Sequence, residues 1–70
     1  MTKALINSKA LRVCMSRQMM DQQALAEKSG VSRLTLNRLV AGDVTVKLST
    51  VGKLARALDV DVEEIADFDN

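Results

Sequence analysis

Apolar residues recur three and four positions apart along most of this chain, as they do on the buried face of an α-helix. The pattern is strongest in the stretch DQQALAEKSGVSRLTLNRLVAG, residues 21–42. Within it, Leu36, Leu39 and Val40 share one helical face. The spacing predicts two short helices joined by a tight turn.

Residues that start and stop helices stand at both ends of this predicted pair. Asp21 and Ser32 can each accept a hydrogen bond from the free N–H groups of a first helical turn. Gly30 and Gly42 are expected to end the two helices in the left-handed conformation that glycine adopts easily. Ala26 supplies the small side chain that two steeply crossing helices need where they touch. An ordinary helical hairpin has some of these features, but their common register favours a DNA-reading helix-turn-helix.

The same spacing predicts three further helices, over residues 8–18, 50–58 and 62–66. A residue suited to capping precedes each of them, and apolar positions then follow on one face. The caps and apolar positions are Asn7 or Ser8 with Leu11, Cys14 and Met15; Ser49 with Val51, Leu54, Ala55 and Leu58; and Asp61 with Val62, Ile65 and Phe68.

Two segments fall outside the helical pattern. Residues 1–6 show no clear periodicity, so we expect a flexible arm. Residues 43–47 alternate like a strand, but a single strand has no hydrogen-bonding partner, so we expect an extended loop anchored by Leu48. The prediction is therefore an all-α, compact five-helix fold that forms a single domain over residues 1–70.

Composition supports a small helical domain and argues against several other classes. The 70 residues are 47% hydrophobic and include no proline and only three glycines. Cys14, the single cysteine, is expected to be buried and reduced, which indicates a cytoplasmic protein. The absence of histidine gives no support to a metal site, and no motif indicates a cofactor or an enzyme. No apolar run is long enough to span a membrane.

Charge is distributed unevenly along the chain. Residues 1–56 hold all ten basic residues and three acidic ones, a net charge of +7, whereas residues 57–70 hold six acidic residues and no basic one, a net charge of −6. The balance of +1 therefore hides a basic part suited to phosphate and an acidic end.

The stretch at residues 21–42, together with LSTVGKLARALDVDVEEI at residues 48–65, resembles the Cro/C1-type, or XRE, family of phage-repressor helix-turn-helix domains. The resemblance implies a lambda-repressor-like fold and a sequence-specific regulator of transcription that binds double-stranded DNA, a repressor of the phage or mobile-element type. The third helix would lie in the major groove. The positions that match base-reading residues are Arg33, Leu34, Thr35, Asn37 and Arg38, and those that match phosphate-contacting residues are Gln22, Ser32, Thr45 and Lys47.

The chain departs from the family pattern at three positions. Met15 stands where the family often has arginine, and Val40 stands where it often has the glutamate that pairs with that arginine. Since both are apolar here, we expect Met15 and Val40 to touch, and such a replacement is often neutral or stabilising. Met19 replaces the usual glycine before the second helix, so the resemblance does not predict the backbone conformation of that turn.

The resemblance also implies partners. We expect a homodimer that binds a palindromic DNA site. We also expect the protein to be bacterial or phage-encoded and cytoplasmic, and to associate with the nucleoid when it binds DNA. The first candidate for the partner surface is the group Val60, Val62, Ile65 and Phe68, which otherwise closes the core of the monomer. The alternative function is a protein-interaction module or an antitoxin on the same fold, with the acidic residues 59–69 as its protein-binding site.

Overall fold

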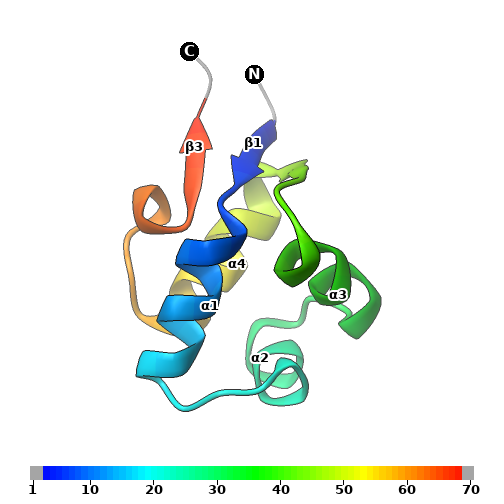
Figure 1. The fold of residues 1–70 in the computed structure, drawn as a ribbon, viewed down its shortest axis with the longest axis vertical. Coiled ribbons are helices and arrows are strands. Elements are labelled where there is room, and N and C mark those ends of the chain that lie inside the picture. The colour runs from blue at the N-terminus through cyan, green and yellow to red at the C-terminus, as the bar shows by residue number, and fades with distance from the viewer. Residues whose placement is uncertain (1–2, 69–70) are drawn as a thin grey trace.

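The computed structural model describes residues 3–68, which form four α-helices, one short 3₁₀-helix and a three-stranded antiparallel sheet (Figure 1). The helices lie close to four of the five predicted ranges, so the prediction of an all-α, five-helix fold was right about the helix-turn-helix and wrong about the sheet. The elements are β1 (Lys3–Ile6), α1 (Ser8–Arg17), α2 (Gln22–Ser29), α3 (Arg33–Ala41), β2 (Thr45–Lys47), α4 (Leu48–Leu58), η1 (Val62–Glu64) and β3 (Ala66–Phe68).

The sheet brings together segments that are distant in the sequence. β1 lies in its centre and pairs antiparallel with β2 on one side and with β3 on the other. Lys3 lies opposite Lys47, and Leu5 lies opposite both Thr45 and Asp67. The expected arm is therefore a strand over its described part, and residues 1–2 lie outside the described residues. The expected loop after α3 is a strand as well, because it pairs with β1 at the beginning of the described chain.

The last part of the chain also differs from the prediction. The expected fifth helix is a single 3₁₀ turn, in which the Glu64 carboxylate accepts a hydrogen bond from the Asp61 N–H at 3.2 Å. The chain then extends into β3, because residues 66–68 pair with β1 instead of continuing the turn. β1 and β3 consequently lie side by side at one end of the molecule (Figure 1).

The beginning of α4 and the end of α3 differ from the predicted caps. α4 begins at Leu48 with Lys47 at its cap position, and no side chain accepts a hydrogen bond there, so Ser49 is not a cap. Leu48 is 40% exposed and does not anchor the core as expected. Gly42 does end α3, but its φ of −178° is extended backbone and not the predicted left-handed conformation.

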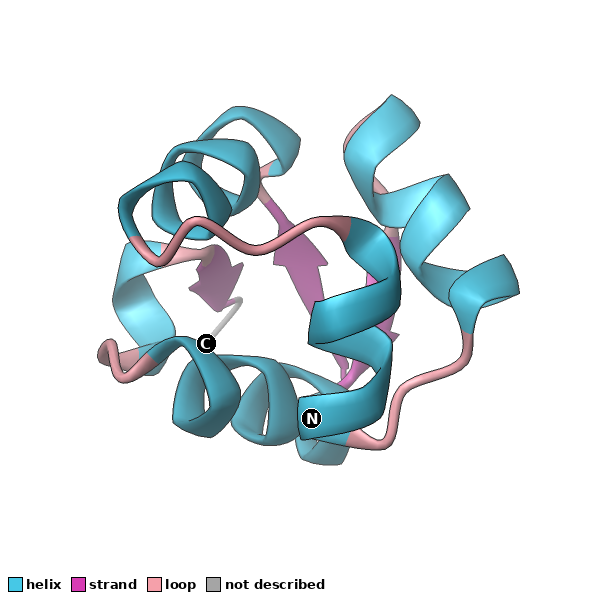
Figure 2. Ribbon diagram, turned by 90° about the horizontal axis from the view of Figure 1, so that it is seen from below, coloured by secondary structure: helices cyan, strands magenta, loops and turns pink. Residues whose placement is uncertain are grey.

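The core lies between the helices and the inner face of the sheet; seen from below, the strands lie behind the helices (Figure 2). Cys14 is buried as a free thiol, as predicted. Ile65 is fully buried, so it closes the core and does not belong to a partner surface, whereas Phe68 is 38% exposed. The largest fully buried side chains are Ile6, Leu11, Leu25, Leu36, Leu39, Leu54, Leu58, Ile65 and Val51.

The turn between α1 and α2 contains a strained residue. Met19 has a φ of +54°, in the left-handed region, and its side chain is 92% exposed. Its N–H donates to the Ser16 carbonyl at 3.0 Å, and the N–H of Met20 donates to the Met15 carbonyl at 3.0 Å. The backbone of Met19 therefore adopts a left-handed conformation that glycine would accept without strain, at a cost of roughly 1–2 kcal/mol.

Candidate nucleic-acid interface

Local hydrogen bonds define the turn between α2 and α3. α2 begins after Asp21, whose Oδ1 accepts a hydrogen bond from the Ala24 N–H at 2.8 Å. It ends at Gly30, whose φ of +80° is left-handed and whose N–H donates to the Ala26 carbonyl at 2.9 Å. Ala26 is half-buried against the core. The caps predicted for this helix are confirmed, and they set the direction in which the chain enters α3.

α3 buries one side and presents the other to solvent. Ser32 caps it, since its Oγ accepts a hydrogen bond from the Thr35 N–H at 3.1 Å. Leu36 and Leu39 are fully buried and fix the inner side of the helix. The positions that the resemblance assigns to base reading lie on the other side: Arg33, Leu34, Asn37 and Arg38 are exposed, and Thr35 is half-buried.

Leu34 and Thr35 differ in the groups that they can offer to DNA. Leu34 is 65% exposed, so a large apolar surface stands in solvent beside the arginines of α3. The hydroxyl of Thr35 accepts a hydrogen bond from Ser32 Oγ at 3.0 Å and thus belongs to the cap. The same cap engages Ser32, a predicted phosphate contact, although its side chain remains exposed.

Gln22 occupies a more enclosed place than the other predicted phosphate contacts. It is half-buried and lines a hollow of 380 Å³ together with Arg12, Met15 and Val40. Among the side chains of residues 3–68, its Oε1 is the buried oxygen or nitrogen that lacks a hydrogen-bond partner. Gln22 therefore lies between α1 and the end of α3.

Arg12 is a positioning residue that the sequence reasoning missed. Its Nη1 donates to the carbonyl oxygen of Val40 at 2.8 Å, in the last turn of α3. The last carbonyls of a helix lack internal partners and carry partial negative charge, so a cation there is favourable. Arg12 thus ties α1 to α3 through the backbone, where the family pattern uses a side-chain ion pair. Met15 and Val40 line the same hollow, and their contact stays a prediction.

The segment after α3 is tied to the beginning of the chain. The N–H of Ser8 donates to Asp43 Oδ1 at 3.0 Å, and the N–H of Ile6 donates to the Val44 carbonyl at 2.8 Å. These two bonds hold β2 beside β1. The signal in the sequence was only the short alternation of residues 43–47, which does not identify the partner strand.

Thr45 and Lys47, the other predicted phosphate contacts, lie on the exposed face of β2. Lys47 is directly opposite Lys3 of β1, and like charges at such positions repel each other. Lys3, which the sequence reasoning left in a flexible arm, therefore adds positive charge next to a predicted DNA contact.

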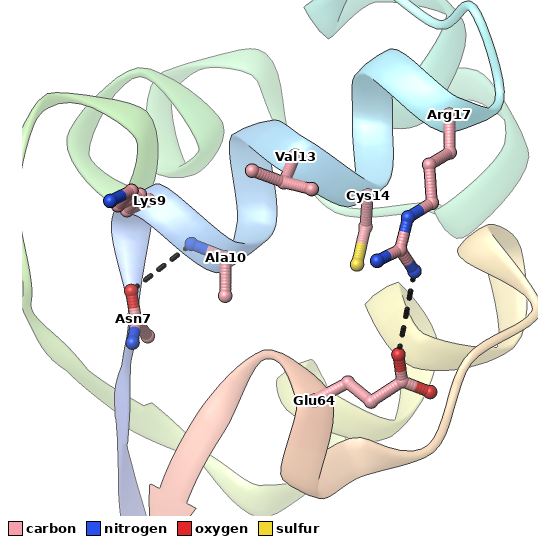
Figure 3. A pocket seen from close by; sticks show the side chains of 7 residues that line it. All are labelled: Asn7, Lys9, Ala10, Val13, Cys14, Arg17 and Glu64. Carbon is pink, nitrogen blue, oxygen red and sulfur yellow. Dashed lines mark hydrogen bonds and ion pairs between the residues drawn. The ribbon is translucent and has the colours of Figure 1, made fainter.

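The acidic end of the chain meets α1. Figure 3 shows Arg17 pointing toward Glu64 beside a hollow that Asn7 and Val13 also line. The Arg17 Nη1 and Glu64 Oε1 atoms are 3.6 Å apart, and both side chains are substantially exposed, so this ion pair adds little stability. It nevertheless neutralises part of the acidic end.

Other kinds of site find no support in the described part of the chain. Within residues 3–68, no group of three or more His, Cys, Asp and Glu side chains is placed to hold a metal ion. None of the helices described has the length and apolar character needed to cross a membrane.

The chain belongs to the helix-turn-helix family of DNA-binding transcription regulators, which are not enzymes: the family model matches residues 9–65. Among solved structures, it is similar to the restriction-modification controller protein C.AhdI from Aeromonas hydrophila, with 32% sequence identity and a TM-score of 0.74. That similarity covers 81% of this chain and 86% of the controller protein. A search of curated protein sequences found no match.

Proposed function

We propose that this protein is a sequence-specific repressor of the phage or mobile-element type that reads the major groove of double-stranded DNA with α3. The observation that carries the proposal is the two-sided character of α3. Its inner side is anchored by the fully buried Leu36 and Leu39, while Arg33 and Arg38 stand exposed on the other side. A rigidly held helix with free arginines is suited to reading base edges.

The exposed side chains of α3 offer a defined chemistry. A guanidinium group can bind O6 and N7 of guanine through two parallel hydrogen bonds, so Arg33 and Arg38 favour guanine. Leu34 favours the methyl group of thymine because it is apolar and 65% exposed. Asn37 can bind N6 and N7 of adenine, and Thr35 is the weakest candidate because it is half-buried and its hydroxyl oxygen already accepts a hydrogen bond from Ser32.

Phosphate contacts supply the affinity in this proposal. Gln22 and Ser32 flank the starts of α2 and α3, where free N–H groups favour an anion. Thr45 and Lys47 contribute from the exposed face of β2. These contacts position α3 and make binding dependent on salt, but they carry no sequence information of their own.

One domain of this size covers few base pairs, so the proposal includes a homodimer on a palindromic site. With Ile65 in the core, the apolar residues left for the partner surface are Val60, Val62 and Phe68. The alternative partner is another protein at the acidic end, with Asp59, Asp61 and Asp67 exposed.

Selection of bound duplexes from a random DNA pool tests the proposal. We expect the wild-type protein to recover a short palindrome. Arg33→Ala should relax the preference at one position of each half-site, with a loss of about 1–3 kcal/mol for the preferred base. Arg17→Ala is the matched control, because Arg17 is an exposed arginine of α1 that lies beside Glu64 and not on α3. Unselective recovery by the wild type, or an unchanged preference with Arg33→Ala, would contradict base reading by α3.

The similarity to C.AhdI favours a second, narrower candidate: control of the genes of a restriction-modification system. Chromatin immunoprecipitation in the native host separates the two. Bound sites next to genes for a restriction enzyme and its methyltransferase would support the controller, whereas sites next to phage genes would support the phage-type repressor.

A further inference from the structure

A basic hollow lies between the C-terminal end of α2 and the outer face of α4. Its volume is 670 Å³, within the range of roughly 300–1,000 Å³ that is usual for ligand sites. We call it the α2–α4 hollow. The lining residues that matter here are Lys28, Ser29, Ser49, Gly52, Lys53 and Arg56.

The charges that line this hollow are all positive. Lys28, Lys53 and Arg56 come from two different helices, and no acidic residue lines the hollow with them. Within residues 3–68, Arg17 and Glu64 form the ion pair, and none of the three cations of the hollow has a carboxylate within 4.0 Å. Like charges around one hollow repel each other, and an anion in the hollow would relieve the repulsion.

Acidic groups lie on an adjoining surface. Arg56 also lines a smaller hollow with Asp59, Asp61 and Glu64. Glu27, next to Lys28 in the chain, accepts a hydrogen bond from Gln23 Nε2 at 3.5 Å. Acidic residues therefore lie beside the α2–α4 hollow, on the side of η1 and on α2, but none of them lines it.

Hydrogen-bond donors complete the lining. Ser49 lies in the first turn of α4, which has no side-chain cap, so free N–H groups and a partial positive charge remain at that end. Ser29 accepts a hydrogen bond from the Val31 N–H at 3.1 Å, which leaves its own proton free to donate. Three cations and two hydroxyl groups around one hollow match the several acceptor oxygens of a phosphate group.

We propose that the α2–α4 hollow is a phosphate-binding site, separate from the base-reading side of α3. The phosphate comes either from the DNA backbone outside the major-groove contact or from a free nucleotide or phosphate ion. Phosphate binding here depends on the residues that line the hollow, so this proposal does not rest on base reading by α3.

Titration of the whole chain with inorganic pyrophosphate, followed by two-dimensional ¹H–¹⁵N NMR, tests the site without DNA. We expect shift changes centred on Lys28, Ser29, Ser49 and Lys53. Lys53→Gln should weaken pyrophosphate binding about tenfold, since it removes one charge-assisted contact. Lys9→Gln is the matched control, because Lys9 is an exposed helical lysine that lines a different hollow; it should change the Kd by less than about twofold.

Gly52→Glu is a second variant, chosen because it should fold normally and still block the hollow. A Cβ at Gly52 meets nothing within 4 Å, and glutamate is a better helix former than glycine, so the fold should be retained. Its carboxylate would stand in the hollow and should abolish pyrophosphate binding, whereas Gly52→Ala should not.

Binding to a fixed duplex at several salt concentrations separates the two sources of phosphate. If the backbone of DNA occupies the hollow, Lys53→Gln should lower the slope of log Kd against log salt by about one, and Lys9→Gln should leave it unchanged. If a free phosphate compound occupies it, the slope should stay constant while pyrophosphate binding is lost. Pyrophosphate shifts spread evenly over all lysines, with equal effects of Lys53→Gln and Lys9→Gln, would overturn the proposal, and Arg33→Ala would still report on base reading.

Discussion

The helix-turn-helix and the sheet are built in opposite ways. The helix-turn-helix is one continuous stretch from Asp21 to Gly42, and each of its boundaries is fixed by residues a few positions away. The sheet joins three short segments from the beginning, the middle and the end of the described chain. The surface proposed to read DNA therefore rests on local hydrogen bonds, while its setting in the molecule rests on long-range pairing.

The sheet also reaches the proposed DNA contacts. β2 carries Thr45 and Lys47, and its place depends on β1, which begins the described chain. The segment before β2 is held by Asp43, which accepts a hydrogen bond from the Ser8 N–H. A change in β1 should thus disturb the flank of the DNA surface and leave the α2–α3 turn intact.

The largest effect that separates the two regions is expected at Ile6. Its side chain is fully buried, so Ile6→Ala should lower the free energy of unfolding by about 2–5 kcal/mol. Leu5→Ala is the control on the same strand, because Leu5 is 38% exposed and should cost less than about 1 kcal/mol. Urea unfolding followed by circular dichroism measures both. Equal and small effects would mean that residues 3–6 are the flexible arm that the sequence suggests.

A smaller effect is expected at the local caps. Asp21→Ala removes the acceptor for the Ala24 N–H and should cost about 1 kcal/mol of unfolding free energy. Asp21→Asn keeps an acceptor oxygen and should remain within about 0.5 kcal/mol of the wild type. The same urea measurement applies, and a loss as large as that of Ile6→Ala would show that this helix is not determined locally.

The smallest effect is a gain in stability at Met19. Glycine accepts a φ of +54° without strain, but it also gives the unfolded chain more conformational entropy. The net effect of Met19→Gly should be a rise of about 0.5–1 kcal/mol in the free energy of unfolding. Met19→Ala keeps the Cβ and should give no gain. Thermal unfolding of the three proteins measures the difference. A destabilised Met19→Gly variant would indicate that the exposed methionine side chain makes a contribution of its own.

Most of the candidate site was predictable from the sequence. Caps and apolar spacing act over three or four residues, so Asp21, Gly30 and Ser32 reveal the bounds of α2 and the beginning of α3. The outward side of α3 follows from the same periodicity, since burying Leu36 and Leu39 leaves Arg33 and Arg38 exposed. The bond from Arg12 to the Val40 carbonyl was not predictable, because a backbone acceptor leaves no mark in the sequence.

The sequence by itself determined the four α-helices, because a helix forms its hydrogen bonds within its own segment, and in three of them a side chain next to the helix caps its beginning. Only the tertiary structure decided that residues 3–6, 45–47 and 66–68 are strands. A strand is completed by hydrogen bonds to a partner, and in this chain the partners are separated by whole helices. The three-dimensional fold likewise gathered Lys28, Lys53 and Arg56 around one hollow, since charges on separate helices meet only when those helices pack.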